Sequence, residues 1–251
     1  MFRHDGPGRS PQENRVVASY LALVGGFVNS AGFVVIGTFT SHVTGNVGRL
    51  SNDLAGAQFG AAATALTMLV AFFSGALVAS MVIESNFFGR NPAGYGVALL
   101  TEAVLLLLFM GAATLTPAAH PRLMDLEAAI LCASMGMQNS LVTRLSGAVV
   151  RTTHLTGVLT DLGIEAGRWF RWWRVSLSER VRVKLAFGEN PPERPSEPKA
   201  ELLVTITVSF VAGAIAGAGL GARLRHVAMV LPAVAVAALG VYALRQDREA
   251  E

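Results

Sequence analysis

The sequence predicts an all-α integral membrane protein of about six membrane-spanning helices, built as two inverted three-span repeats. Each repeat is expected to contain a short broken or re-entrant helix. The composition supports this class, because 52% of the 251 residues are hydrophobic and 15% are charged, against about 25% charged in soluble domains. Long uncharged apolar runs and a duplicated polar, glycine-marked stretch are the other two supporting observations.

The spans are expected at about 16–38, 58–83, 95–115, 125–146, 200–222 and 226–244. Each is long enough to cross a bilayer, which takes about 18 or more mainly apolar residues. Repeat 1 then covers 16–115 and repeat 2 covers 125–244. Residues 1–15 and 245–251 are polar and are expected to be cytoplasmic tails, the first of them flexible.

Residues 42–56 and 154–167 are too short to cross and return, so the sequence predicts broken or re-entrant helices there. Irregular backbone at membrane depth is tolerated where it is buried in protein or lines a wet cavity. The stretch 168–199 is expected to be a cytoplasmic loop. It begins with alternating Arg and Trp, typical of a lipid headgroup region, and ends in a Pro-rich linker.

The distribution of positive charge orients the chain. Most Arg and Lys residues fall on the side of the N-terminus in this topology, which predicts both termini in the cytoplasm of a bacterial inner membrane. The formal net charge of +3 therefore reflects orientation and lipid contact. Nucleic acid is not expected as a partner; the lipid bilayer is.

The duplicated stretches are SHVTG at 41–45 and THLTG at 153–157. A shift of 112 positions places His42 on His154, Thr44 on Thr156 and Gly45 on Gly157. Asn29 and Ser30 match Asn139 and Ser140 at a shift of 110. Matched polar breaks in two halves of a membrane protein point to a binding site between repeats.

The chemistry of these breaks suits a small solute. Threonine can cap free backbone N–H groups, and glycine lets the chain turn and a ligand approach the backbone. A half-helix N-terminus carries partial positive charge, which favours an anion. The predicted substrate-binding residues are Asn29, His42, Thr44, Gly45, Gln138, Asn139, His154, Thr156 and Gly157. The alternative is that these groups only satisfy their own helices.

Charged residues near the breaks are candidates for coupling or charge pairing. Arg49 and Asp53 lie four apart, as do Asp161 and Glu165, so each pair shares a helix face. Arg49 is expected to neutralise Asp53 or Asp161. Glu102 falls inside an expected span, where an unpaired charge is costly and marks a functional candidate.

Gly213, Gly217 and Gly221 recur at four-residue spacing in the fifth expected span. Such a face permits close helix packing. Packing within one chain is the favoured interpretation, and a homodimer seam is the alternative.

Signatures of catalysis are absent from the sequence: it has no Gly-x-Ser-x-Gly, no His-Glu-x-x-His and no phosphate-binding loop. No enzyme activity, cofactor or metal is therefore expected. Two histidines alone make a poor metal site. A haem or enzyme role remains the least favoured hypothesis.

The stretches GGFVNSAGF at 25–33 and HVTGN at 42–46 resemble the first signature of the YoaK family. The second signature is matched by MGMQNS at 135–140 and TTHLTG at 152–157. The resemblance covers roughly 16–244 and implies a bacterial inner-membrane protein with about six spans and a domain of unknown function. The family often has Asp where this chain has Asn29.

The favoured hypothesis is a secondary transporter or permease for a small solute, with an anion as one candidate, held between two Thr-Gly helix starts near the bilayer midplane. A non-transporting membrane scaffold or accessory protein is the alternative.

Overall fold

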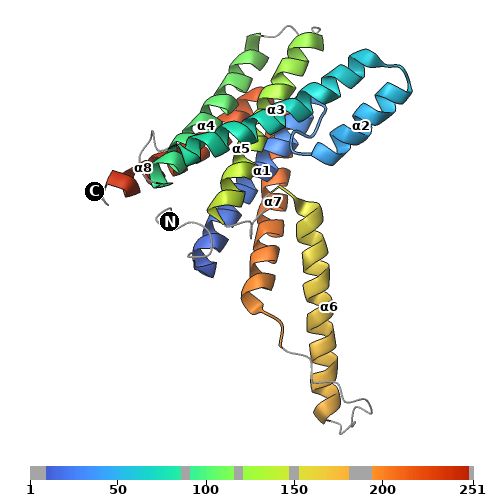
Figure 1. The fold of residues 1–251 in the computed structure, drawn as a ribbon, viewed down its shortest axis with the longest axis vertical. Helices are drawn as coiled ribbons and strands as arrows, with labels where there is room; N and C mark the ends of the chain where they lie inside the picture. Colours follow the sequence, from blue (N-terminus) through green and yellow to red (C-terminus); the bar gives the residue numbers. More distant parts are fainter. Residues whose placement is uncertain (1–9, 86–90, 116–120, 147–152, 181–193, 249–251) are drawn as a thin grey trace.

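The computed structural model describes the chain except residues 1–9, 86–90, 116–120, 147–152, 181–193 and 249–251. All regular structure in the described part is helical (Figure 1). The elements are α1 (Pro11–Ile36), α2 (Val43–Ala55), α3 (Phe59–Glu84), α4 (Asn91–Leu115), α5 (Pro121–Leu145), α6 (Leu155–Arg180), α7 (Glu197–Leu224), the 3₁₀ turn η3 (Arg225–Met229) and α8 (Val230–Arg248).

Helix α1 begins earlier than the expected span and takes in part of the predicted tail. Ser10 is the N-cap, Pro11 opens the first turn, and Ser10 and Glu13 form a reciprocal capping box. Proline suits this position because the first N–H groups of a helix have no intrahelical partner. At the other end, α8 likewise runs to Arg248 and so takes in part of the predicted tail 245–251.

The expected short helix at 42–56 matches α2, but the one at 154–167 does not match α6. Helix α6 continues to Arg180, so the first part of the predicted loop 168–199 is helical. Its Arg and Trp residues are compatible with an amphipathic helix, so the predicted loop is wrong for residues 168–180.

Four described segments are long and apolar enough to cross a membrane: Gln12–Ile36, Phe59–Glu84, Ala93–Thr114 and Glu197–Gln246. The last one contains α7 and α8, separated by η3. Helix α5 is less apolar because it carries groups such as Ser134 and Gln138, both fully buried inside the protein.

The main helix contacts cross between the two halves of the chain. Helix α1 packs chiefly on α7, α3 on α5, and α4 on α8 (Figure 1). The long helices of each half are therefore completed by partners from the other half, while α2 stays against its neighbour α3 and α6 against α7.

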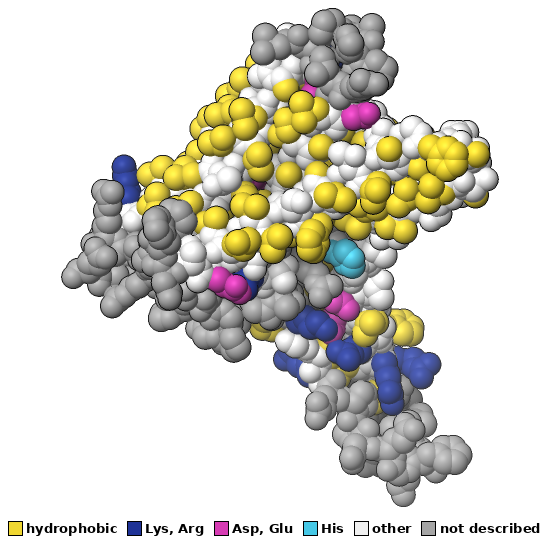
Figure 2. Space-filling view, turned by 45° about the horizontal axis from the view of Figure 1, so that its top comes forward, with side chains coloured by type: hydrophobic (Ala, Val, Ile, Leu, Met, Phe, Trp, Pro, Cys, Tyr) yellow, Lys and Arg dark blue, Asp and Glu magenta, His cyan; other side chains and the backbone are white. Residues whose placement is uncertain are grey.

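Outside the core, the helices expose large apolar side chains. On α3 these include Phe59, Leu66, Val70, Phe73 and Met81. Hydrophobic side chains cover much of the face seen in Figure 2. A surface of this kind fits lipid tails.

Candidate functional site

The two duplicated stretches meet at one cavity of about 710 Å³. Most of its lining falls into pairs, one member from each half of the chain. The pairs are Asn29 and Asn139, Ser41 and Thr153, His42 and His154, Val43 and Leu155, Thr44 and Thr156, and Phe72 and Phe210; Phe39 and Thr143 complete the lining.

The same hydrogen bond anchors each break to the preceding long helix. Ser41 Oγ and its backbone N–H donate to Asn29 Oδ1 at 3.0 and 3.3 Å. In the second half, Thr153 Oγ1 donates to Asn139 Oδ1 at 2.6 Å. The asparagines therefore hold the starts of α2 and α6 at matching places beside the cavity.

Each histidine precedes one of these helices and lies over a glycine. A β-carbon at Gly45 would overlap the imidazole of His42, and one at Gly157 would crowd that of His154. The His42 side chain accepts no hydrogen bond from the first-turn N–H groups of α2. His42 and His154 are both exposed, and both line the cavity.

Close helix contacts place the paired phenylalanines. A β-carbon at Gly26 would overlap the carbonyl oxygen of Phe210, and one at Gly136 would overlap that of Phe72. Only glycine permits this approach, because its backbone has no side chain to hold the helices apart. Phe72 and Phe210 thus reach the cavity from α3 and α7.

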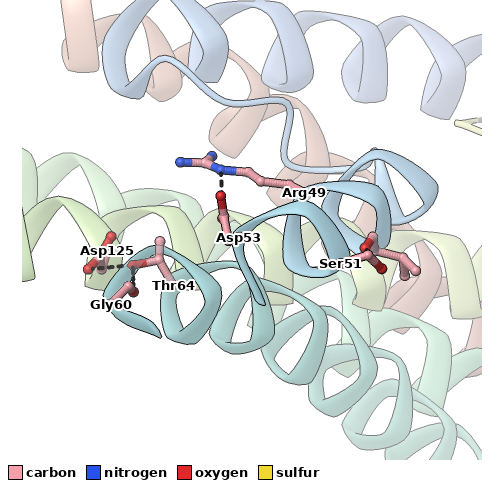
Figure 3. Close-up of polar contacts among 7 residues, drawn as sticks. Arg49, Ser51, Asp53, Gly60, Thr64 and Asp125 are labelled. Carbon is pink, nitrogen blue, oxygen red and sulfur yellow. Dashed lines mark hydrogen bonds and ion pairs between the residues drawn. The ribbon is translucent and has the colours of Figure 1, made fainter. Parts of the chain in front are cut away.

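Arg49 pairs with Asp53 on α2, with 4.0 Å between Arg49 Nε and Asp53 Oδ2 (Figure 3). Of the two expected partners of Arg49, the structure therefore favours Asp53. Arg49 also lines a smaller cavity of about 180 Å³, together with His42 and Gly45. Nearby, Thr64 Oγ1 donates to Asp125 Oδ2 at 3.1 Å, which ties α3 to α5 (Figure 3).

Glu165 ties α6 to α7. Its carboxylate is 2.9 Å from both Lys199 Nζ and Arg168 Nη1, and its side chain is buried. The pKa of Glu165, which lies outside the four candidate spans, is lowered by the Lys199 hydrogen bond and by both cations, against an opposing effect of desolvation. Asp161 is exposed and faces neither cavity.

Glu102 is fully buried in α4, and neither carboxylate oxygen has a hydrogen-bond partner within the described structure. It does not line either cavity. The structure therefore places this candidate coupling group away from the paired residues.

Of the predicted binding residues, Asn29, His42, Thr44 and their counterparts Asn139, His154 and Thr156 line the cavity. Gly45, Gly157 and Gln138 do not line it. The two glycines lie under the imidazoles of His42 and His154. Gln138 is buried, and its Nε2 donates to the Leu21 carbonyl oxygen at 3.1 Å.

Eight lining residues are not among the predicted binding residues: the pairs Ser41 and Thr153, Val43 and Leu155, and Phe72 and Phe210, together with Phe39 and Thr143. The 112-residue shift would have found the first pair. The phenylalanines match only at a shift of 138, because α6 is longer than α2 and a longer stretch separates it from α7.

The histidines do not gather other metal ligands. Among the described residues there is no group of three or more His, Cys, Asp or Glu side chains that could hold a metal ion. What the cavity offers instead is amide, hydroxyl and imidazole groups beside phenyl rings.

Crossed long helices with apolar exteriors, around a cavity lined by polar side chains and phenyl rings, define a helical membrane protein. The chain belongs to the family described as "Protein of unknown function (DUF1275)", whose model matches residues 17–242. It is also 26% identical over 145 residues to UPF0700 transmembrane protein YoaK of Bacillus subtilis (strain 168). The resemblance to the YoaK family is thereby confirmed.

That similarity covers 57% of this chain and 63% of the Bacillus protein, so the match spans less than two thirds of the relative. No solved structure matches the chain.

Proposed function

We propose that this protein is a permease for a small anion, which binds in the 710 Å³ cavity between the starts of α2 and α6. We place it in a bacterial inner membrane with both termini in the cytoplasm, in accordance with the positive charge on that side. The observation that carries the proposal is the pairing of the cavity residues across the two halves.

The pairing supports an inverted repeat. Gly75 meets the Ala133 carbonyl as Gly213 meets that of Leu23, and each pair of residues lies in corresponding helices. Gly96 and Gly240 approach each other directly where α4 crosses α8. These exchanged contacts are those expected when one half is related to the other by a two-fold axis.

An odd number of crossings per half would make this axis lie in the membrane plane. We propose that α1, α3 and α4 cross in the first half and α5, α7 and α8 in the second, while α2 and α6 do not cross. The 3₁₀ turn η3 separates α7 from α8, so that each can be one membrane crossing. The buried amides and hydroxyls of α5 explain how it can cross despite its lower hydropathy.

The cavity chemistry favours an anion. Asn29 Oδ1 already accepts two hydrogen bonds and Asn139 Oδ1 accepts one, so these oxygens have little remaining capacity as acceptors. The imidazoles, the Thr44 and Thr156 hydroxyls and the first turns of two helices remain as donors. No carboxylate lies among the described lining residues. The phenyl rings would contact an apolar part of the solute.

A non-transporting scaffold is the competing function. A scaffold would require the cavity to be filled by lipid or closed in the membrane. The exposure of His42 and His154, which line the cavity, does not tell whether water or lipid fills it. Water access separates the two functions.

The test uses single cysteines at Thr44 or Thr156 in a Cys132→Ser background. We expect a membrane-impermeant thiol reagent, applied to membranes from each side, to label both sites, because a transport cavity must reach water. A Phe73→Cys variant is the matched lipid-facing control, since Phe73 is 67% exposed on the apolar face of α3. It should react only with a membrane-soluble reagent. Cys132 is fully buried, so the native chain controls for background labelling.

Labelling at both breaks, slowed by added small carboxylates, would support the permease. Reaction of both sites with the membrane-soluble reagent alone would mean that lipid fills the cavity. That result would overturn the permease and favour the scaffold.

A further inference from the structure

We propose that the second half of α6 is a binding surface for anionic phospholipid headgroups on the cytoplasmic side of the membrane. This surface, residues 168–175, is called the Arg–Trp segment below. It does not depend on the permease proposal, because it lies outside the cavity lining.

The Arg–Trp segment has no counterpart in the first half of the chain. Helix α2 ends at Ala55, which corresponds to Gly167 at the 112-residue shift, whereas α6 continues for more than three further turns to Arg180. In Figure 1, α6 extends well beyond the packed helices. Neither the cavity nor the helix packing explains this extension.

The charged side chains of the segment itself are all arginines. Arg168, Arg171 and Arg174 recur every three residues and are all exposed, and Arg168 also pairs with Glu165 just before the segment. Residues 166–175 contain no acidic side chain. Figure 2 shows Lys and Arg side chains gathered on the projecting part of the molecule, below the apolar body. Guanidinium groups bind phosphate oxygens in a bidentate manner, which suits phospholipid headgroups.

Its aromatic side chains favour a membrane over a soluble anion. Phe170 and Trp173 are 62% and 55% exposed. Trp169 and Trp172 pack edge to face, and the guanidinium of Arg194 lies over their rings at 6.0 and 5.7 Å. Aromatic rings next to arginines are typical of the zone between headgroups and acyl chains.

Neighbouring ion pairs fix the depth of the segment. Arg15 at the start of α1 pairs with Glu201 at the start of α7, and Lys199 pairs with Glu165 one turn before the segment. Charged groups at the ends of apolar helices mark the membrane surface. The Arg–Trp segment therefore begins at the level where phosphate groups lie. Charge and depth together select anionic lipid as the occupant.

All three tryptophans of the chain lie in this segment, so tryptophan fluorescence reports on it alone. The full-length protein would be placed in nanodiscs whose brominated acyl chains are carried either by phosphatidylglycerol or by phosphatidylcholine, at equal total bromine content. We expect brominated phosphatidylglycerol to quench at least about twofold more, because the arginines concentrate anionic lipid near the rings. Added salt should reduce this difference.

An Arg171→Gln/Arg174→Gln variant should remove most of the preference. The matched control is Arg223→Gln/Arg225→Gln, which removes two charges near η3 and should leave the preference unchanged. Equal quenching by the two lipids in the native protein would overturn the proposal. So would weak quenching by both lipids together with strong quenching by aqueous acrylamide, which would indicate a soluble polyanion or protein partner.

Discussion

At the scale of single residues, the matched asparagines do not have equal freedom to change. Asn29 uses its carbonyl oxygen as an acceptor for Ser41, and within the described structure its amide nitrogen donates to no protein acceptor. Asn139 uses both ends of its amide: Oδ1 accepts from Thr153, and Nδ2 donates to the Met135 carbonyl at 2.7 Å. An aspartate at position 29 could keep the hydrogen bonds that Asn29 accepts, whereas an aspartate at position 139 would lose the hydrogen bond that Asn139 donates.

We therefore expect Asn29→Asp to leave thermal stability nearly unchanged and Asn139→Asp to cost about 1–3 kcal/mol, because the aspartate loses a donor and faces a carbonyl. Thermal unfolding of the two purified variants in detergent measures this difference. Asn29→Asp should still weaken anion binding, since it adds negative charge to the cavity. Equal stability of the two variants would contradict the assigned hydrogen bonds.

At the scale of helices, the sequence predicted most elements, because long uncharged runs and the Gly213–Gly217–Gly221 spacing have few alternative interpretations. The three glycines do pack within the chain, against α1 at Leu23, Phe27 and Ala31. The second half of α6 was not predicted, since its many arginines give it a low hydropathy, and only their three-residue spacing at 168, 171 and 174 indicates a helix.

Helix α7 offers an internal control for the glycine packing. A β-carbon at Gly213 would overlap the Leu23 carbonyl, whereas one at Gly219 would meet open space. We expect Gly213→Ala to destabilise the protein by about 1–3 kcal/mol through overpacking. Gly219→Ala should be neutral or stabilise it by up to about 1 kcal/mol, because alanine favours helix. Thermal unfolding in detergent measures both, and equal midpoints would refute the close α1–α7 contact.

At the scale of the whole molecule, the candidate site depends on pairings that no local pattern specifies. The duplicated stretches were visible in the sequence, and they do line one cavity. The pairing of Phe72 with Phe210 was not visible in the sequence. The number of positions between matching residues of the two halves grows from 112 at the duplicated stretches to 138 at these phenylalanines. Recognising the pair requires knowing that α3 packs on α5 and α7 on α1.

These exchanged pairings predict that neither half is stable alone. Residues 1–118 would lack the main packing partners of α1, α3 and α4, which lie in the second half. We expect each half to be degraded or to aggregate when it is expressed alone, because its glycine-lined helix faces would contact lipid instead of a partner helix. Co-expressed, 1–118 and 119–251 should form a complex that co-purifies through a tag on one half. Gly213→Ala in the second half should weaken this complex, and Gly219→Ala should not. A first half that purifies as a folded monomer would show that its helices pack among themselves, and would refute the exchanged arrangement.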